Sequence, residues 1–303
     1  MMRLRGAAVV LAMLIAALAA AVAATVFADQ QRWSRMVEYR RDQVQAQALA
    51  MAGIQWARQI LDDDARRSEI DHLGEPWALA LPPIPLPNGE IRGSIVDAQG
   101  RLNVNALGDA DASSASERAR IAALFAQRGG PNTALDAIAD WIDADGAVRE
   151  AGAEDAYYAA QAVPGLAANV PVLRVAELAT VKGVTPQALA AVAPYLSALP
   201  RGTPVNVNTA PAEVLAAIVD KLGADGAAAL VARRAREPYG TIAEFRSRLP
   251  KGATLSDERA LAVKSTYFYV TVEARQGATV ARARALLHRG GSEWPTIIWQ
   301  VVE

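Results

Sequence analysis

The hydrophobic pattern begins with an uncharged block, Ala7–Ala28, near the start of the chain. As an α-helix this block would rise about 33 Å, which is enough to cross a hydrocarbon core of about 30 Å. The block therefore predicts a transmembrane helix over residues 7–28.

A periodic pattern replaces the uncharged block from residue 29 onward. Residues 30–61 contain no proline, and Gly53 is their one glycine. Apolar residues recur about once per helical turn, with charged and amide side chains between them. We expect the helix to continue as an amphipathic stalk over residues 29–67, with an apolar stripe of Trp33, Val37, Val44, Leu49, Ala52, Trp56 and Ile60.

The segment after the stalk has the alternation of short strands. Residues 81–87 contain four prolines and are expected to be an extended loop. Ile91–Val96 and Arg101–Val104 are then expected to form a β-hairpin around Ala98–Gly100. We interpret Asn103 and Asn105 as turn and edge residues.

A helical block separates these strands from a second group at the C-terminus. Within the block, Thr185 before Pro186 is a helix N-cap signal, and Thr241 with Glu244 has the spacing of a capping box. The expected C-terminal strands span residues 266–274, 279–288 and 296–302. The chain is therefore expected to be α+β, with a long N-terminal helix packed on one antiparallel sheet and a large inserted α-helical domain.

Composition limits the functions that remain. The 303 residues carry 31 basic and 32 acidic side chains, and a polyanion-binding protein usually has a basic surplus. Cysteine is absent, which excludes disulfides, thiolate metal sites and a cysteine nucleophile. No Gly-x-Ser-x-Gly elbow, Walker loop or His-Glu-x-x-His segment occurs, so we expect no enzymatic activity.

Three interpretations of the N-terminal block compete. A secretory signal would be cleaved near the alanine-rich residues 19–24, and a plain membrane anchor would not be cleaved. A prepilin leader would be cut before the block. We favour the leader, because the block is longer than a signal core and continues as a helix. Two arginines precede the block and four follow it closely, so the positive-inside rule does not set its orientation.

Several segments resemble the K-type minor pseudopilins of type II secretion. Arg5-Gly6-Ala7 resembles a prepilin peptidase site, with cleavage after Gly6 and Ala7 as the mature N-terminus. Asp71–Ala78, Ile95–Leu107 and Val205–Pro211 resemble further segments of that family, and they occur in its order. The resemblance covers nearly the whole chain.

Leu11 occupies mature position five, where most pilins carry a glutamate. Within the pilin superfamily this departure is typical of the K-type subunits. The glutamate is thought to meet the N-terminal amine of the subunit above, and a subunit at the tip has none above it. An unpaired carboxylate in hydrocarbon is costly, which Leu11 avoids.

The resemblance implies a pseudopilin fold in a single-pass protein of the bacterial inner membrane, with its C-terminal region in the periplasm. The implied partners are I-type and J-type minor pseudopilins in a tip complex, other pseudopilins, prepilin peptidase and membrane lipid. The implied divisions are a leader at residues 1–6, a transmembrane segment at 7–28, a stalk at 29–67, a sheet lobe at 68–110 and 262–303, and an inserted helical domain at 111–261.

A rival function comes from segments that resemble helix-hairpin-helix units. Val205–Pro211 with Gly240–Phe245 resembles one unit, and Val175–Leu196 a weaker copy, as in membrane-anchored DNA receptors. One hairpin has a single glycine, and the other places Asp225 where a phosphate would sit, so DNA is disfavoured. A minor pilin of a type IV pilus is a further alternative. We assign the nearby basic residues to solvated helix faces, namely Lys182, Arg233, Arg234 and Arg236.

The densest acidic cluster lies between residues 140 and 158. Its spacing repeats part of a calcium loop, but the full twelve-residue pattern is absent, so spacing alone favours capping and solvation. The segment also resembles the Trp-x-Asp-x-Asp…Glu-Asp-x-Tyr-Tyr stretch of the K-type family, whose members bind calcium in this domain. The resemblance implies a structural Ca²⁺ site formed by Asp143, Asp145, Glu154 and Asp155, with Asp140 as a further candidate.

Overall fold

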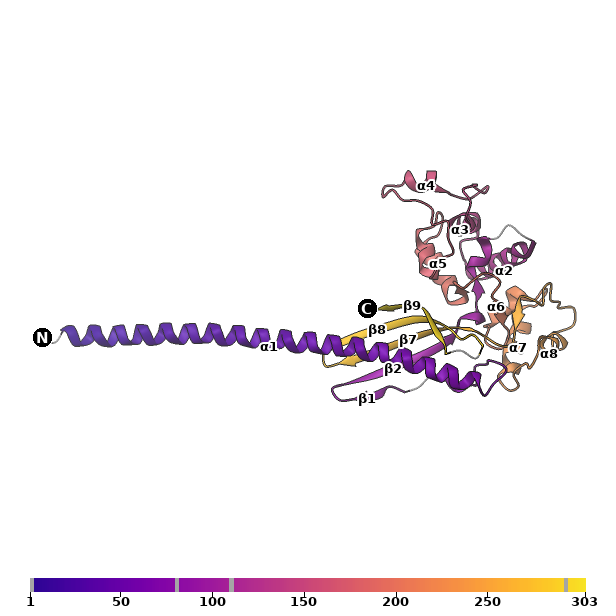
Figure 1. Ribbon diagram of the computed structural model, residues 1–303. Coiled ribbons are helices and arrows are strands. Elements are labelled where there is room, and N and C mark those ends of the chain that lie inside the picture. The colour runs from indigo at the N-terminus through magenta and orange to yellow at the C-terminus, as the bar shows by residue number, and fades with distance from the viewer. Residues whose placement is uncertain (1–2, 80–81, 109–111, 292–293) are drawn as a thin grey trace.

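The computed structural model describes residues 3–79, 82–108, 112–291 and 294–303. Met1 and Met2 of the expected leader, and residues 109–111 at the expected start of the insert, lie outside this description. Helix α1 runs unbroken over Arg3–Ala65, and its N-terminal half projects away from the rest of the chain (Figure 1). Among the described residues it is the one helix long and apolar enough to cross a membrane, and its apolar window is not buried.

A five-stranded antiparallel sheet packs against the C-terminal half of α1, which confirms the expected fold class (Figure 1). Its strand order is β1-β2-β7-β8-β9, and Gly277, with φ of 54°, makes the turn between β7 and β8. The strands are β1 (Ile84–Leu86), β2 (Gly89–Asp97), β7 (Tyr267–Gln276), β8 (Thr279–His288) and β9 (Thr296–Val302).

The face of α1 that meets the sheet consists mostly of small residues. The expected stripe is wrong for Trp33, Val37, Val44 and Trp56, which are exposed, and right for Leu49 and Ile60, which pack against the core. A Cβ on Gly53 would lie 2.6 Å from Val272 Cγ1, so the helix approaches the sheet too closely for larger side chains. The sheet presents small residues as well, including Ala274 and Ala283. The buried stripe of α1 consists of Ala46, Ala50, Gly53, Ile54, Ala57 and Leu61.

The expected hairpin between residues 91 and 104 is also wrong. Strand β2 pairs with β1 and β7, so its hairpin partner comes from the proline-rich segment that we expected to be a loop. Pro85 is tolerated because β1 is an edge strand. After β2, the Asp97 side chain accepts a hydrogen bond from the Gln99 N–H at 2.7 Å and caps a 3₁₀ turn, Ala98–Gly100, that redirects the chain.

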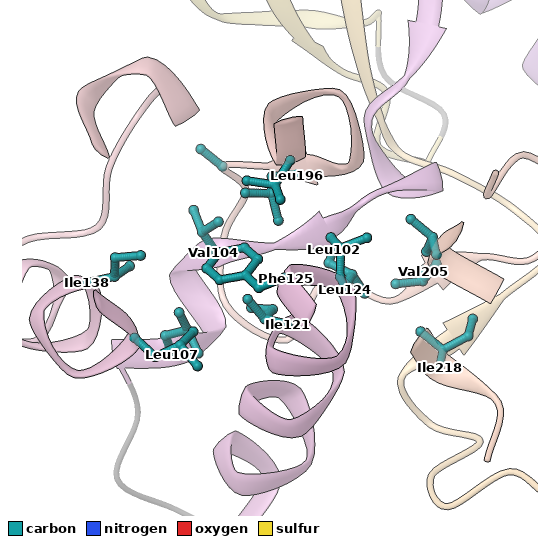
Figure 2. Close-up of a cluster of buried hydrophobic side chains, with 14 of the residues drawn as sticks. Leu102, Val104, Leu107, Ile121, Leu124, Phe125, Ile138, Leu196, Val205 and Ile218 are labelled. Carbon is teal, nitrogen blue, oxygen red and sulfur yellow. The ribbon is translucent and has the colours of Figure 1, made fainter. Parts of the chain in front are cut away.

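The insert between β2 and β7 is helical and has its own core. Figure 2 shows this core, in which Leu102, Ile121, Leu124, Phe125 and Ile138 are almost completely buried. The N-cap bonds of Thr185 and Thr241 form as expected. The helices are α2 (Ala112–Arg128), α3 (Leu135–Ile142), α4 (Asp155–Ala159), α5 (Pro186–Val192), α6 (Ala212–Ile218), α7 (Ala224–Arg234) and α8 (Ile242–Ser247).

Two parts of the insert share one plan. In the first, β3 (Leu102–Asn103) pairs in parallel with β4 (Leu196–Ser197), and in the second, β5 (Val205–Asn206) pairs in parallel with β6 (Leu261–Ala262). Each first strand ends at the first asparagine of an Asn-Val-Asn segment, Asn103–Asn105 in the first part and Asn206–Asn208 in the second.

The second asparagine of each segment clamps a distant backbone. The Asn105 side chain donates to Val172 O and accepts from Val172 N–H, both at 2.9 Å. The Asn208 side chain likewise donates to Tyr239 O at 2.9 Å and accepts from the Tyr239 N–H at 2.8 Å. All four asparagines are at most 5% exposed. The turn role expected of Asn103 is confirmed, because its Oδ1 accepts from the Asn105 N–H at 3.2 Å, whereas Asn105 bonds to a distant segment instead.

Candidate metal centre

Three acidic side chains of the predicted cluster lie inside the insert. Asp140 is fully buried on α3, and Asp143 follows as the C-cap residue with extended backbone. Glu154, the N-cap residue of α4, is 5% exposed. Carboxylates in the interior require compensating charge or hydrogen bonds.

Arg149 supplies positive charge to two of these carboxylates. Its Nη1 donates to Asp140 Oδ1 at 2.6 Å and also to Asp143 Oδ2, and its backbone N–H donates to Asp140 Oδ2 at 3.2 Å. Burial alone would lower the pKa of Arg149, but the hydrogen bonds with Asp143 and Asp140 outweigh it and hold that pKa above its usual value. The pair Asp140 and Asp143 is therefore compensated within the chain.

Glu154 has no comparable partner. Both of its carboxylate oxygens are buried, and neither has a hydrogen-bond partner in the described part of the chain. Burial, with repulsion from Asp140 and Asp143, raises the pKa of Glu154 to about 7. The Glu154 carboxyl is therefore partly protonated near neutral pH, unless a bound cation compensates its negative charge.

The other two predicted ligands lie at the surface of the same irregular segment. Asp145 Oδ1 accepts from the Ala147 N–H at 2.8 Å, and Asp155 Oδ1 accepts from the Ala167 N–H at 2.9 Å. Both side chains close loops, and their charges add to the negative potential at Glu154. The structure thus places the four predicted ligands on one segment, with Asp143 and Glu154 inside and Asp145 and Asp155 outside.

The donor atoms are oxygens, the type that a hard cation such as Ca²⁺ prefers, but among the described residues no three acidic side chains of this centre come within 4.8 Å of one another, as those of Asp64, Asp71 and Glu75 do. Besides both oxygens of Glu154, Asp143 Oδ1 and Asn169 Oδ1 are buried oxygens without a hydrogen-bond partner in the described residues. The backbone N–H of Asn169 donates to Trp141 O at 3.0 Å, which holds it beside the end of α3. Buried oxygens are normally paired, and Ca²⁺ accepts six to eight oxygen ligands in flexible geometry. A bound ion would supply the positive charge that Glu154 lacks.

Sequence reasoning missed three residues of this centre. Arg149 could have been found, since it is the one basic residue between Asp140 and Glu154. Gly152 lies against Asp140, and a Cβ there would lie 1.8 Å from Asp140 Oδ2. Asn169 reaches the centre through a loop that no local pattern predicts.

The basic residues near the expected hairpins are partly used inside the insert. Lys182 Nζ donates to Gly152 O at 2.8 Å and lies 5.1 Å from the centre of the Tyr157 ring. Arg234 is 6% exposed and donates to Val207 O at 2.6 Å, so its assignment to a solvated face is wrong. Asp225 is exposed in the first turn of α7. The second hairpin therefore presents an exposed carboxylate, that of Asp225, and not a series of exposed basic side chains that could bind phosphates.

We expect the full-length chain to bind duplex DNA weakly, with a Kd of about 10⁻⁴ M or weaker at physiological salt. Fluorescence anisotropy with a labelled duplex at two salt concentrations measures this. Binding in the micromolar range that weakens steeply with added salt would contradict the expectation and favour a DNA receptor.

Comparison with known proteins identifies the family. Two family models, both described as type II secretion system (T2SS), protein K, match residues 100–201 and 205–264. The type II secretion system protein K of Pectobacterium carotovorum subsp. carotovorum is 31% identical, and the match covers 96% of this chain and 94% of the relative. The chain belongs to the type II secretion system protein K family.

Other protein K sequences agree with this assignment. The protein of Klebsiella pneumoniae is 32% identical, with 95% of this chain and 94% of the relative covered. The protein of Pseudomonas aeruginosa is 33% identical over 81% of this chain and 77% of its own length. The predicted family and the role as a minor pseudopilin in type II secretion are therefore confirmed, and neither alternative function is supported.

A solved structure has the same fold as this protein K. It is the crystal structure of the GspK–GspI–GspJ complex from enterotoxigenic Escherichia coli, matched with a TM-score of 0.77. The match covers 88% of this chain and 99% of the solved chain, at 24% identity. The long helix, the sheet and the helical insert are thus features of a known fold, and the exposed apolar start of α1 is compatible with anchoring in a membrane.

Proposed function

We propose that this protein K is the tip subunit of a pseudopilus, anchored in the bacterial inner membrane with its C-terminal lobes in the periplasm. It assembles there with I-type and J-type minor pseudopilins and acts as a structural subunit without catalysis. The observation that carries the proposal is the fold that it shares with a chain solved in complex with GspI and GspJ. Leu11, apolar where other pilins have glutamate, supports a position with no subunit above it.

Co-purification tests this proposal. The full-length chain is expressed with the I-type and J-type proteins of the same genome and isolated in detergent by a tag on this chain. A stoichiometric ternary complex is expected. Isolation of the chain without either pseudopilin, at expression levels where both are present, would contradict the assignment of partners.

Processing is expected at Gly6. The membrane-extracted protein should begin at Ala7 and still contain the apolar block, and Gly6→Leu should leave the leader attached. N-terminal sequencing measures both, and Ala12→Leu, a comparable enlargement within the span, should be processed normally. A mature start near residue 25 would show that the block is a secretory signal instead.

The proposed function includes a structural Ca²⁺ ion at the acidic centre. Asp143 and Glu154 would hold it from the inside, with Asn169 beside them and Asp145 and Asp155 from the exposed side. The support comes from the buried oxygens of Asp143, Glu154 and Asn169 that have no hydrogen-bond partner in the described residues. The ion would pin residues 143–174, in which α4 is the one α-helix described.

Calcium is expected to raise Tm by about 5–10 °C at a hundredfold excess over Kd, because a ligand that binds the folded state stabilises it by mass action. Glu154→Gln and Asp143→Ala should remove most of this rise. Asp225→Ala, at an exposed acid on α7, should keep it. Superimposable melting curves of the parent chain with calcium and with chelator would contradict the site.

The effect should also depend on pH. The folded pKa of Glu154 is raised from 4.5 to about 7, so its contribution to stability is fully present below 4.5 and is lost as pH rises through 7. Calcium should therefore raise Tm more at pH 8 than at pH 5.5. An equal rise at both values would argue against Glu154 as a ligand.

A further inference from the structure

The insert and the sheet lobe have separate hydrophobic cores. In the part of the chain that the structure describes, one buried cluster draws all its members from residues 102–261, and another comes from α1, Trp77 and the sheet. The two share no residue. Between them lies a small cluster of Ala98, Leu199 and Leu286, against which the partly buried Tyr267, Tyr269 and Trp299 pack. This contact is small beside either core, so buried polar groups also help to set how the insert is oriented on the sheet.

Asp97 lies at the centre of those polar groups. It is 3% exposed, at the end of β2. Its Oδ2 accepts from two side chains of the insert, Thr209 Oγ1 at 2.6 Å and Asn206 Nδ2 at 3.1 Å. The same oxygen accepts from Ser265 Oγ, just before β7, at 2.6 Å. One carboxylate therefore holds the insert and both strands that border it.

Arg289 ties this centre to the end of α1. Its guanidinium donates to Asp64 Oδ2 at 2.8 Å, to Asp71 Oδ1, and to Ser265 O at 2.9 Å. The backbone O of Asp71 in turn accepts from Asn206 Nδ2 at 3.0 Å. A continuous set of buried hydrogen bonds thus runs from the stalk helix through Arg289 and Asp71 to the insert.

Negative charge exceeds positive charge in this region. Four carboxylates are buried, those of Asp64, Asp71, Glu75 and Asp97, and Arg289 is the buried cation that bonds two of them. Among the described residues, these carboxylates also face His72, 4.0 Å from Glu75, and Arg101, which interacts with Asp97. Lys264 pairs with Glu69 at the surface.

We propose that Asp97 is a positioning residue, which with Asn206, Thr209 and Arg289 forms a polar joint that fixes the orientation of the insert on the sheet. Opening of this joint lets the insert pivot while both hydrophobic cores stay intact. The joint uses Asn206, the first asparagine of the second Asn-Val-Asn segment, whose side chain bonds to residues outside the insert. Asn103, at the equivalent position of the first part, bonds to Leu199 and Pro200 within the insert.

The joint should tighten on acidification. Burial raises the pKa of Asp97 from 3.8 to about 6, against the hydrogen bonds from Ser265 and Thr209. Burial likewise raises the pKa of Asp64 to about 6. The stability that each group contributes is fully present below 3.8 and is lost as pH rises through 6. A joint that exposes Asp97 when it opens is therefore held more firmly at pH 5 than at pH 8.

Distance measurements on the full-length chain in detergent test this proposal. The chain has no cysteine, so nitroxide labels can be placed at Ala228→Cys on α7 and Val280→Cys on β8, both exposed. Double electron–electron resonance should give a narrow distance distribution at pH 5 and a broader one at pH 8. Thr209→Val removes the hydroxyl that donates to Asp97. This substitution should widen the distance distribution about two-fold at pH 8, because open states become populated.

Two further variants make the test specific. Asp97→Asn removes one of the two groups that titrate near pH 6 and should reduce the change in width between pH 5 and pH 8, leaving the part due to Asp64. Arg282→Met, at an exposed ion pair with Glu273, should behave as the parent chain. Circular dichroism should show that each variant stays folded. If Asp97→Asn does not fold, the comparison of Thr209→Val with the parent chain tests the proposal. One unchanged width for the parent chain and Thr209→Val at both pH values would overturn the proposal.

Discussion

Replacing Asn208 by alanine should destabilise the insert by about 2–4 kcal/mol, because two buried backbone groups lose their partner. The Asn208 side chain pairs with both the N–H and the C=O of Tyr239, and it is 1% exposed, so these bonds are shielded from bulk solvent. Truncation leaves a donor and an acceptor unsatisfied and adds a small cavity. The effect should therefore exceed that of an ordinary surface substitution.

Urea unfolding of the full-length chain in detergent, followed by circular dichroism, measures this loss. Asn105→Ala should cost a similar amount, since Asn105 clamps Val172 in the same way. Asn132→Ala, at an exposed asparagine, should change stability by less than about 0.5 kcal/mol. Equal stability of Asn208→Ala and Asn132→Ala would show that the clamp contributes nothing.

Gly53→Leu should lower the stability of the lobe formed by α1 and the sheet by about 2–3 kcal/mol, through overpacking. Leucine is the better helix former, by about 1 kcal/mol, so propensity acts in the opposite direction. The cost of overpacking should exceed the gain in helix propensity, because even the first added carbon would lie 2.6 Å from Val272 Cγ1 and 3.3 Å from Ile91 Cδ1. The helix must lift from the sheet to make room.

Thermal unfolding separates these two contributions. Ala52→Leu adds the same side chain one residue earlier, on the exposed side of α1, and should leave Tm nearly unchanged. Gly53→Ala should fall between the two, since it gains propensity and meets the same contact. A Tm for Gly53→Leu at or above that of the parent chain would mean that α1 does not pack closely on β7.

Local signals predicted the elements whose structure is decided locally. Strands β7, β8 and β9 follow from β-branched residues and a glycine turn. The cap at Thr185 follows from Pro186 beside it, and the cap at Thr241 from Glu244 three residues later. The uncharged block and the periodic segment after it likewise predicted one continuous helix. Each of these features depends on residues within a few positions.

The errors share a cause, which is contact between distant segments. Periodicity alone could not identify the buried stripe of α1. The helix lies so close to the sheet that Gly53 and alanines fit between them, whereas large side chains such as Trp56 lie on the exposed side. The expected hairpin failed because Asp97 bonds to Asn206 and Thr209, more than a hundred residues away. The acidic centre was predicted from the family resemblance, since spacing alone favoured capping, and Asn169, which lies far along the chain in a loop, was not part of that prediction.

The place of the insert between β2 and β7 affects how the sheet can form. Asp97 and Phe268 are paired neighbours on these strands, yet the chain between them is about 170 residues long. Joining the ends of an unstructured loop of that length costs about 4–5 kcal/mol of chain entropy. A folded insert, whose two ends meet at Asp97, replaces this long loop by a short rigid bridge. An ordered insert therefore favours closure of the sheet, and substitutions deep in the insert are expected to weaken strand pairing without touching a strand.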